Sequence, residues 1–291
     1  MSTKSPVAFL GTGLMGFPMA RRLLLSGFPL AVWNRTREKA LPLAQQGATL
    51  AASPSQALAE AEVAVLMLAD ATAIHGALIE AAAPLAGKTI VQMGTIAPRE
   101  SRELAEKIAA SGGRYLEAPV LGSVPQATEG QLAVMVGGDP FLFQELLPLL
   151  RCFGPNPRLI GPVGSASTLK LALNNLIAAH AAAFATSLAL VQNAGVPLEV
   201  FLEILRPSPF FAPTFERKLP VMLNPEGAPV NFPAKHMLKD VRLIAATAGE
   251  LGVEATLVEA LEALYGKAVA QGLADADYAA VAKVLTGDRD R

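Results

Sequence analysis

The 291-residue sequence changes its pattern once, near Pro162, and this change constrains the fold more than any other feature. Before Pro162, short apolar runs such as Val7–Leu10 and Val63–Leu68 alternate with segments of helical periodicity such as Leu14–Ser26 and Ala71–Ala82. Strands that alternate with helices indicate βαβ units, which build a parallel, doubly wound sheet. Further strands are expected at Pro29–Trp33, Thr89–Gln92, Arg114–Leu116 and Ala133–Val136.

Only helical patterns follow Pro162. They predict helices at Ser165–Ala194, Leu198–Leu205, Phe211–Leu223, Leu238–Leu251, Ala255–Ala270 and Tyr278–Leu285. We therefore predict an α/β fold class in two domains. A doubly wound domain spans residues 1–162, and an all-α domain spans residues 163–291 and is entered by a long interdomain helix.

Charge and composition exclude several classes of protein. The chain has 24 Lys and Arg against 25 Asp and Glu, a net charge of 24 − 25 = −1. A nucleic-acid-binding protein needs excess basic charge, and an anionic membrane attracts polybasic segments, so neither partner is expected. Hydrophobic residues make up 52% of the chain, which indicates a globular protein with a large core. The single cysteine, Cys152, forms no internal disulfide, so a cytoplasmic location is expected.

The segment Leu171–Leu198 contains no charged residue and is long enough to span a membrane. It is rich in alanine and contains several polar side chains, among them Asn174, Asn175 and His180. This composition favours a helix buried inside the protein over one that faces lipid. The first apolar run, Val7–Leu10, is also too short for the core of a signal peptide.

A glycine-rich turn follows the first predicted strand and opens the first predicted helix. It reads Gly11-Thr12-Gly13-Leu14-Met15-Gly16. In such a turn Gly11 permits the tight bend, Gly13 lets a pyrophosphate approach the backbone, and Gly16 lets the helix pack closely on the strand. The helix N-terminus presents free N–H groups to the anion. Because it lies in a strand–turn–helix context, the motif predicts a Rossmann domain that binds a nicotinamide dinucleotide.

The end of the second strand predicts which dinucleotide is bound. An NAD site usually has an acidic residue there, which binds the ribose 2′-hydroxyl. This sequence has Asn34, Arg35 and Thr36 instead. The guanidinium of Arg35 suits a 2′-phosphate, and Asn34 and Thr36 can donate hydrogen bonds to it. We therefore predict a preference for NADP over NAD, with NAD as the alternative.

Lys170 and Asn174 are the candidates for chemistry in the long helix, where they lie four residues apart and so on one face. A lysine in an apolar helix is costly to bury without a partner or a function. The alternative is a cation that reaches solvent from the first turn, but a cation there opposes the helix dipole. Gly122 and Ser123 follow the strand near Tyr115, where doubly wound sheets bind ligands, and a plain turn is the alternative for this pair.

Two other groups of polar residues have ordinary structural explanations. Lys239 and Asp240 form a pattern typical of a solvated charged pair on a helix. His75, His180 and His236 have no metal-ligand spacing, so no metal is predicted.

Together these motifs resemble the β-hydroxyacid dehydrogenase family, which includes 3-hydroxyisobutyrate dehydrogenases and glyoxylate/succinic semialdehyde reductases. Four segments carry the resemblance in the family's order. They are Phe9–Ala20, the Ala118–Ser123 loop continuing to Leu132, the run from Gly164 through Lys170 to Asn175, and Phe232–Asp240. The likeness covers nearly the whole chain.

The resemblance implies roles for individual residues. Lys170 would be the catalytic lysine and Asn174 its helper, while Gly122, Ser123, Phe232 and Asp240 would bind substrate. The further cofactor contacts that the resemblance implies are Met67, Leu68, Thr95 and Lys239. It also implies a homodimer or homotetramer that forms through the helical domain.

The expected activity is the reversible, NADPH-dependent reduction of a small carboxylated aldehyde to a hydroxy acid. Many family members have Ser-Gly-Gly in the substrate loop, but this chain has Leu121, Gly122 and Ser123, a Gly-Ser ending similar to that of the glyoxylate and succinic semialdehyde reductases. Leu121 removes a hydroxyl that often holds the substrate carboxylate, so the substrate stays open. The alternatives are an imine reductase, although those enzymes generally lack a lysine at position 170, and a non-catalytic NADP-binding module.

Overall fold

The computed structural model describes residues 4–286. Its internal contacts divide the chain into two compact units, one ending at Lys170 and the other beginning at Leu171. The division therefore falls inside the long helix α8 (Ser165–Asn193), eight residues beyond the predicted boundary at 162/163.

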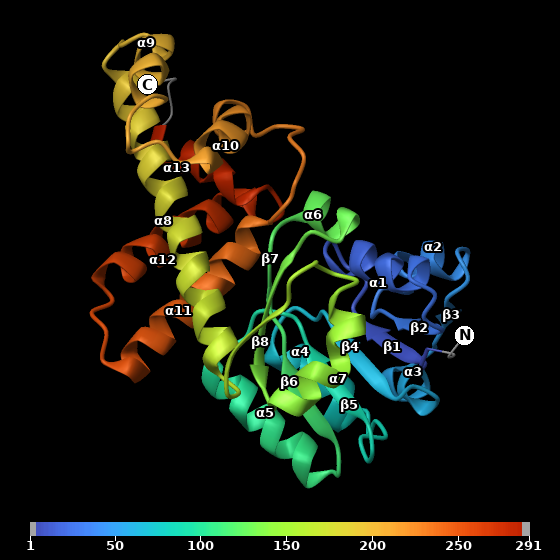
Figure 1. The fold of residues 1–291 in the computed structure, drawn as a ribbon. Coiled ribbons are helices and arrows are strands. Elements are labelled where there is room, and N and C mark those ends of the chain that lie inside the picture. The colour runs from blue at the N-terminus through green and yellow to red at the C-terminus, as the bar shows by residue number, and fades with distance from the viewer. Residues whose placement is uncertain (1–3, 287–291) are drawn as a thin grey trace. The chain divides into compact units, whose positions relative to one another are not determined.

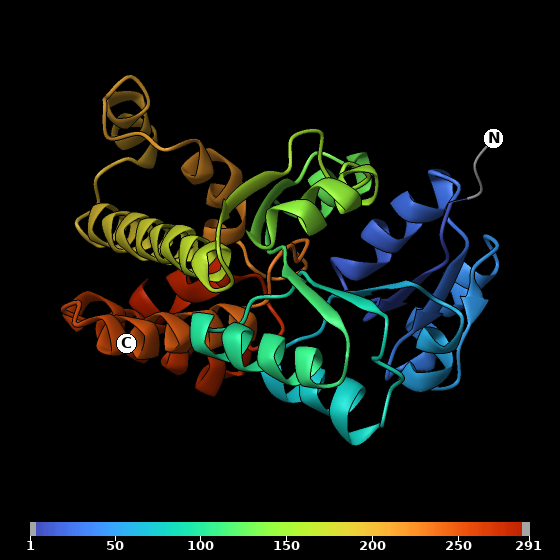
Figure 2. The ribbon, with the colours of Figure 1, turned by 60° about the horizontal axis from the view of Figure 1, so that its bottom comes forward.

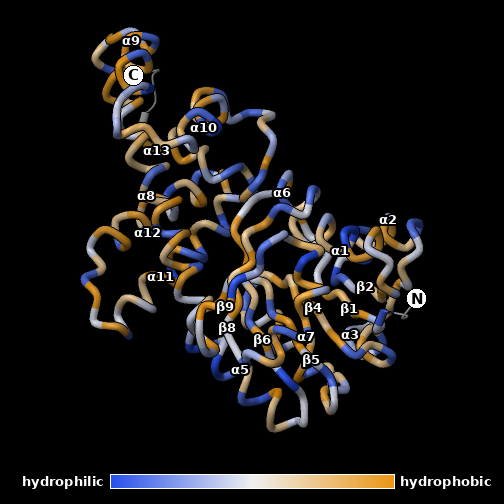
Figure 3. Tube along the Cα trace, viewed as in Figure 1, coloured by the Kyte–Doolittle hydropathy of each residue, from blue (hydrophilic) through white to orange (hydrophobic). Residues whose placement is uncertain are grey.

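The first unit is built on a sheet whose first six strands run parallel in the order β3-β2-β1-β4-β5-β6 (Figure 1). Their bounds are β1 (Val7–Leu10), β2 (Leu30–Trp33), β3 (Thr49–Leu50), β4 (Val63–Leu66), β5 (Thr89–Gln92) and β6 (Arg114–Glu117). All residues of β1, β4 and β5 are buried. Strands β1 and β4 read as continuous apolar runs (Figure 3), while β5 has buried polar residues, Thr89 and Gln92, at its two ends.

Alternate residues of the central strands pack into two separate hydrophobic cores. Phe9 and Val65 belong to one core with side chains of α1 (Gly16–Leu25), α2 (Leu41–Ala44) and α7 (Pro140–Leu150). The opposite core contains Leu10 and Leu66. It is completed by helices α3 (Pro54–Ala59), α4 (Ala71–His75), which continues as a wider turn over Gly76–Glu80, and α5 (Pro98–Ala110). Side chains alternate between the two faces of a strand, so each face of the sheet has a hydrophobic core, and helices cover both faces (Figure 2).

The last strands depart from the predicted parallel arrangement. β8 (Ala133–Gly138) pairs antiparallel with β6, and β7 (Val120–Leu121) pairs antiparallel with β8, while β9 (Arg158–Gly161) runs parallel to β8. The prediction of a parallel strand at Ala133–Val136 is therefore wrong in direction. Residues between β7 and β8 form the short helix α6 (Val124–Glu129), so the chain turns back and pairs with the strand it has just left.

The second unit is helical. It comprises α8 beyond Lys170, α9 (Leu198–Leu205), α10 (Pro213–Leu223), α11 (Ala234–Leu251), α12 (Thr256–Ala268), a turn at Tyr278–Val281 and α13 (Ala282–Thr286). Ala178, Ala185 and Leu188 of α8 lie in one core with Val241 of α11 and the fully buried Tyr265 of α12. Helix α11 begins four residues earlier than predicted, directly after Pro233.

By length and composition α8 is the one helix among the described residues that could cross a membrane. Its buried alanines and leucines form the centre of the helical core, as predicted for a buried helix. We therefore describe α8 as a core helix.

Candidate active site

The glycine-rich turn has the geometry that its sequence predicts. Gly11 has a φ of +99°, and a Cβ there would lie 2.3 Å from the carbonyl oxygen of Met67. A Cβ on Gly16 would lie 1.8 Å from the carbonyl oxygen of Gly11. Both glycines are therefore required by the protein's own packing, the first for the turn and the second for the approach of α1 to β1.

Gly13 is different, since the protein itself does not require a glycine there. A Cβ on Gly13 would meet no atom within 4 Å among the described residues, and its φ is not positive. The neighbouring Thr12 has a buried Oγ1 without a hydrogen-bond partner in the part of the chain that the structure describes. Open space and an unsatisfied hydroxyl beside a helix N-terminus fit the pyrophosphate of a dinucleotide.

Asn34 connects this turn to the end of β2 by side-chain hydrogen bonds. Its Oδ1 accepts a hydrogen bond from the backbone N–H of Thr12 at 3.0 Å, and its Nδ2 donates to the carbonyl oxygen of Thr36 at 2.7 Å. The side chain thus organises two loops, a function that its sequence position did not predict. Arg35 and Thr36 are exposed beside it and are accessible to a ligand.

The loops that follow β4 and β5 lie beside one another in this unit. A Cβ on Gly94 would lie 2.7 Å from the carbonyl oxygen of Leu68, and Gln92 Nε2 donates to the carbonyl oxygen of Gly94 at 3.1 Å. Met67, Leu68 and Thr95 are all half-buried on these loops. The structure therefore brings these predicted cofactor contacts to the carboxyl edge of the sheet that also carries Gly11.

The predicted substrate loop is held by Gln126, a residue that the sequence analysis did not single out. Gln126 Oε1 accepts hydrogen bonds from Ser123 N at 3.0 Å and from Ser123 Oγ at 2.7 Å. Ser123 is also the N-cap residue of α6, so the Ser-x-x-Gln spacing of a capping box could have identified Gln126. Gly122 has a φ of +140°, and a Cβ there would lie 2.6 Å from Leu132, so the loop needs a glycine at this position.

Lys170 and Asn174 are both buried on α8, with 9% and 2% of their surfaces exposed. Within the helical unit, Asn174 Nδ2 donates a 2.6 Å hydrogen bond to Asp240 Oδ2, and Asp240 Oδ1 lies 2.9 Å from Lys239 Nζ. Asp240 is only 2% exposed, so the prediction of a solvated charged pair is wrong for this residue. The burial of Asp240 is explained by its two polar neighbours, Asn174 and Lys239.

The buried Oδ1 of Asn174 has no hydrogen-bond partner within residues 4–286. Since Asp240 already accepts from Nδ2, the amide is fixed in orientation and keeps a free acceptor. A free acceptor one helical turn from a buried lysine suits the binding of a polar ligand group.

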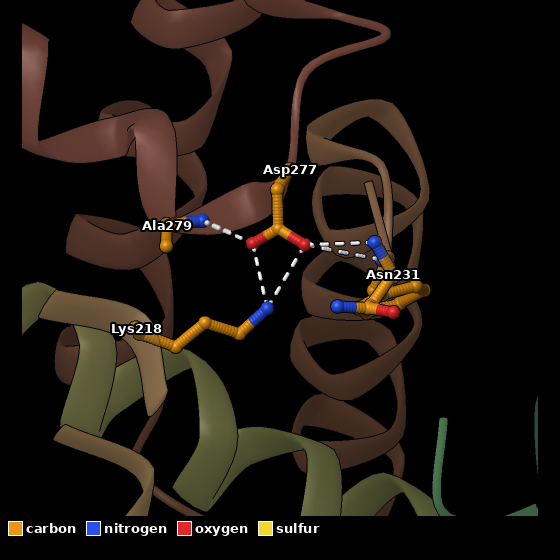
Figure 4. A network of polar contacts seen from close by, with 5 residues as sticks. Lys218, Asn231, Asp277 and Ala279 are labelled. Carbon is orange, nitrogen blue, oxygen red and sulfur yellow. Dashed lines mark hydrogen bonds and ion pairs between the residues drawn. The ribbon is translucent and has the colours of Figure 1, made fainter. Parts of the chain in front are cut away.

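Phe232 belongs to a segment that is pinned by the carboxylate of Asp277 (Figure 4). Asp277 accepts from the backbone N–H groups of Asn231 and Phe232 at 3.0 and 3.3 Å. Lys218 Nζ donates to both of its carboxylate oxygens, at 2.8 and 2.9 Å. Asp277 therefore fixes the backbone of the segment that leads into α11 by hydrogen bonds.

His236 lies on the first turn of α11, and its ring stacks on Phe232 with ring centres 6.4 Å apart. Burial lowers the pKa of His236 below its usual value, and the positive charges of Lys239 and Lys235 lower it further. Its ring is therefore neutral at neutral pH. Among residues 4–286 no group of three or more His, Cys, Asp or Glu side chains is arranged to hold a metal ion.

The sheet order and the glycine-rich turn define the first unit as a nicotinamide dinucleotide-binding domain of an oxidoreductase. Comparison with known families agrees. The NAD binding domain of 6-phosphogluconate dehydrogenase matches residues 6–161, and the NAD-binding domain of NADP-dependent 3-hydroxyisobutyrate dehydrogenase matches residues 164–285.

Individual relatives are similar over nearly the whole chain. Glyoxylate/succinic semialdehyde reductase 1 of Arabidopsis thaliana is 33% identical over 98% of this chain and 99% of its own length. The structure of 3-hydroxyisobutyrate dehydrogenase from Mycobacterium tuberculosis has a TM-score of 0.85 and 26% identity, and the alignment covers 97% of this chain and 99% of that one. A reductive aminase from Aspergillus terreus has a TM-score of 0.65 and 28% identity, over 96% and 98% of the two chains.

The protein belongs to the β-hydroxyacid dehydrogenase family. It is an NAD(P)-dependent reductase of the 3-hydroxyisobutyrate dehydrogenase type.

Proposed function

We propose that this protein is an NADPH-dependent reductase of small carboxylated aldehydes, of the glyoxylate or succinic semialdehyde type, and that it forms hydroxy acids reversibly. The observation that carries the proposal is the buried pair on α8, Lys170 and, one turn later, Asn174, whose amide is held by Asp240. A buried cation beside an oriented amide suits the negative oxygen that develops when a carbonyl is reduced.

The first unit supplies the residues that would hold the cofactor. The Gly11–Gly16 turn would bind the pyrophosphate, with Thr12 and Gly13 closest to it, and Arg35 would bind a 2′-phosphate. Met67, Leu68, Thr95 and, from α11, Lys239 would complete the contacts. When bound, NADPH supplies the hydride that reduces the carbonyl carbon.

Lys170 as an ammonium would stabilise the developing oxyanion and then donate its proton to that oxygen. Asn174 would orient the same oxygen. The backbone of Gly122 and the hydroxyl of Ser123 would hold the substrate carboxylate, with Phe232 and Asp240 lining the substrate site. Ser123 donates to Gln126, so binding a carboxylate requires this hydroxyl to rotate toward the substrate.

The direct test follows NADPH oxidation by absorbance with glyoxylate, succinic semialdehyde and a cyclic imine as separate substrates. The proposal expects turnover of at least one carboxylated aldehyde at a higher kcat/KM than the imine. Preferential reduction of the imine would favour the alternative of an imine reductase, which the likeness to the reductive aminase supports. NADPH binding without turnover of any substrate would favour a non-catalytic module.

We also propose a homodimer or homotetramer that forms through the helical unit. Several large apolar side chains of α8, α9 and the segment after α9 are exposed, among them Leu190, Ile204 and Phe210, at 68%, 69% and 80%. Exposed apolar residues of this kind favour association. Sedimentation equilibrium tests the proposal, since a monomer at micromolar concentration would contradict it.

A further inference from the structure

The carboxylate of Glu117 is a buried charged group without a role in the reaction proposed above. Glu117 ends β6 and is 0% exposed. The substrate loop with Gly122 and Ser123 follows it directly in the chain. A carboxylate is rarely buried so completely unless hydrogen bonds compensate for the loss of water.

The compensating hydrogen bonds come mainly from the start of α8. Glu117 Oε1 accepts from the backbone N–H groups of Gly164, Ala166 and Ser167 at 2.8, 2.8 and 3.3 Å. Ser167 Oγ donates to Oε2 at 2.6 Å. Gly164 is the N-cap residue, because its carbonyl oxygen accepts the first helical hydrogen bond, from Thr168 N. Glu117 therefore satisfies N–H groups that a helix start leaves without partners.

The same carboxylate is also tied to the sheet and to α5. Ser101 Oγ of α5 donates to Oε2 at 2.6 Å and lies 2.8 Å from the hydroxyl of Tyr115. On the other side, a Cβ on Gly137 of β8 would lie 2.3 Å from Oε1, so that glycine leaves the space that the carboxylate occupies. One side chain thus joins β6, β8, α5 and the first turn of α8.

The first turn of α8 leads directly to the proposed general acid. Ser167 precedes Lys170 by three residues, so the two lie on neighbouring turns of one helix face. We propose that Glu117 is a positioning residue, which fixes the start of α8 and thereby sets the place of Lys170 relative to the loop of Gly122 and Ser123. This inference rests on the proposed role of Lys170 and adds the residue that holds it.

The two serines on Oε2 provide a matched pair of variants. Ser167→Ala and Ser101→Ala each remove one 2.6 Å hydrogen bond to the same oxygen, but only Ser167 belongs to α8. Glu117→Gln removes the charge while keeping the shape. A misplacement of about 1 Å costs up to roughly 100-fold in rate, so Glu117→Gln and Ser167→Ala should lower kcat about ten- to a hundredfold. NADPH affinity should be unchanged. Ser101→Ala should lower the melting temperature but leave kcat close to that of the unmodified protein.

Hydrogen exchange of the peptide 164–170 gives a readout that needs no turnover. Glu117→Gln and Ser167→Ala should speed its exchange more than Ser101→Ala does. Equal losses of kcat in both serine variants, or unchanged exchange of this peptide in Glu117→Gln, would overturn the proposal. If the unmodified protein reduces no aldehyde, the proposed function fails, while the exchange comparison still decides whether Glu117 anchors α8.

Discussion

Two asparagine side chains in the candidate site are held in place by hydrogen bonds within the protein. Asn34 binds backbone groups of two loops, and Asn174 gives one amide hydrogen to Asp240 while its oxygen has no partner within the described chain. Both side chains are therefore oriented before a ligand arrives. Preorganised polar groups of this kind contribute to catalysis because they need not reorganise during the reaction.

The first prediction at this scale concerns Lys170. General acid–base catalysis typically contributes about 10²–10⁴-fold, so Lys170→Ala should lower kcat by at least that order. Lys170→Arg should recover little activity, because a guanidinium keeps the charge but is a poor proton donor near neutral pH. The measurement is kcat for both variants, with NADPH affinity by fluorescence titration as the control for folding. Retention of more than a tenth of the activity in Lys170→Ala would exclude Lys170 as the acid.

Arg35 provides the test of cofactor choice. Its side chain is exposed at the end of β2, where it can pair with a 2′-phosphate. The unmodified protein should have a higher kcat/KM with NADPH than with NADH. Arg35→Asp should reverse or abolish that preference, since it removes the cation and adds repulsion. Equal efficiency with both cofactors before any substitution would contradict the assignment.

The candidate site residues that could be proposed from the sequence are those that local chemistry defines. The three glycines and the i, i+4 pair of Lys170 and Asn174 could be identified because one turn or one helix defines them. The partnership of Asn174 with Asp240 joins residues 66 positions apart, and that of Glu117 with Ser167 joins residues 50 apart. Such contacts are determined by tertiary packing, so neither periodicity nor spacing could predict them.

At the scale of elements, two glycines of the strand–turn–helix unit are expected to serve different needs. Gly16 is needed for the packing of the helix on the strand, and Gly13 leaves room for the cofactor. Gly16→Ala would place a methyl group 1.8 Å from a backbone oxygen, whereas Gly13→Ala would meet no described atom. We therefore expect Gly16→Ala to lower the melting temperature markedly. Gly13→Ala should fold like the unmodified protein but bind NADPH more weakly. Thermal unfolding and NADPH titration of both variants test this, and normal NADPH affinity in Gly13→Ala would count against the proposed pyrophosphate position.

A second prediction at this scale concerns the ion pair between Lys218 and Asp277. Asp277 is 1% exposed at its side chain and Lys218 13%, and the pair joins α10 to the segment before α11 (Figure 4). Asp277→Ala leaves a nearly buried cation without its partner, which typically costs about 3–5 kcal/mol of unfolding free energy. Asp277→Asn should cost less, because its amide oxygen still accepts from the backbone. Urea unfolding of both variants measures the difference. Equal losses of unfolding free energy would contradict the role of the Asp277 side chain as acceptor for the backbone N–H groups.

Strands and helices with a clear hydrophobic periodicity were predicted well. The helix α7 was not predicted, and the direction of strand β8 was not predicted correctly. β1, β5 and α9 have the predicted bounds, and β4 begins at the predicted Val63 but ends two residues earlier, at Leu66, since apolar runs and helical periodicity are local properties. The helix α7 was missed because its sequence, Pro-Phe-Leu-Phe-Gln-Glu-Leu-Leu-Pro-Leu-Leu, is apolar on most sides and contains two prolines. The direction of β8 depends on which neighbour it pairs with, and composition does not encode that choice.

At the scale of the whole molecule, stability should depend on pH through His236. Its folded pKa lies below the unfolded value of about 6.5, mainly because of burial and despite the opposing charges of Asp240 and Asp275. The unfolded chain therefore binds a proton that the folded chain does not. The free energy of unfolding should fall as the pH decreases from about 6.5 toward the folded pKa. Urea unfolding at several pH values gives the free energy of unfolding as a function of pH. In His236→Gln this free energy should change less steeply with pH, and an unchanged dependence on pH would exclude His236 as its source.

The helix α8 has a consequence for how such a protein can evolve. The two compact units divide between Lys170 and Leu171, so the division separates the lysine from the asparagine one turn later. An exchange of whole domains between relatives at that point would join a lysine from one ancestor to an asparagine from another within a single helical turn. A crossover near residue 162 would keep α8 intact but would separate Glu117 from the helix start that it binds. The two halves are therefore expected to be inherited together.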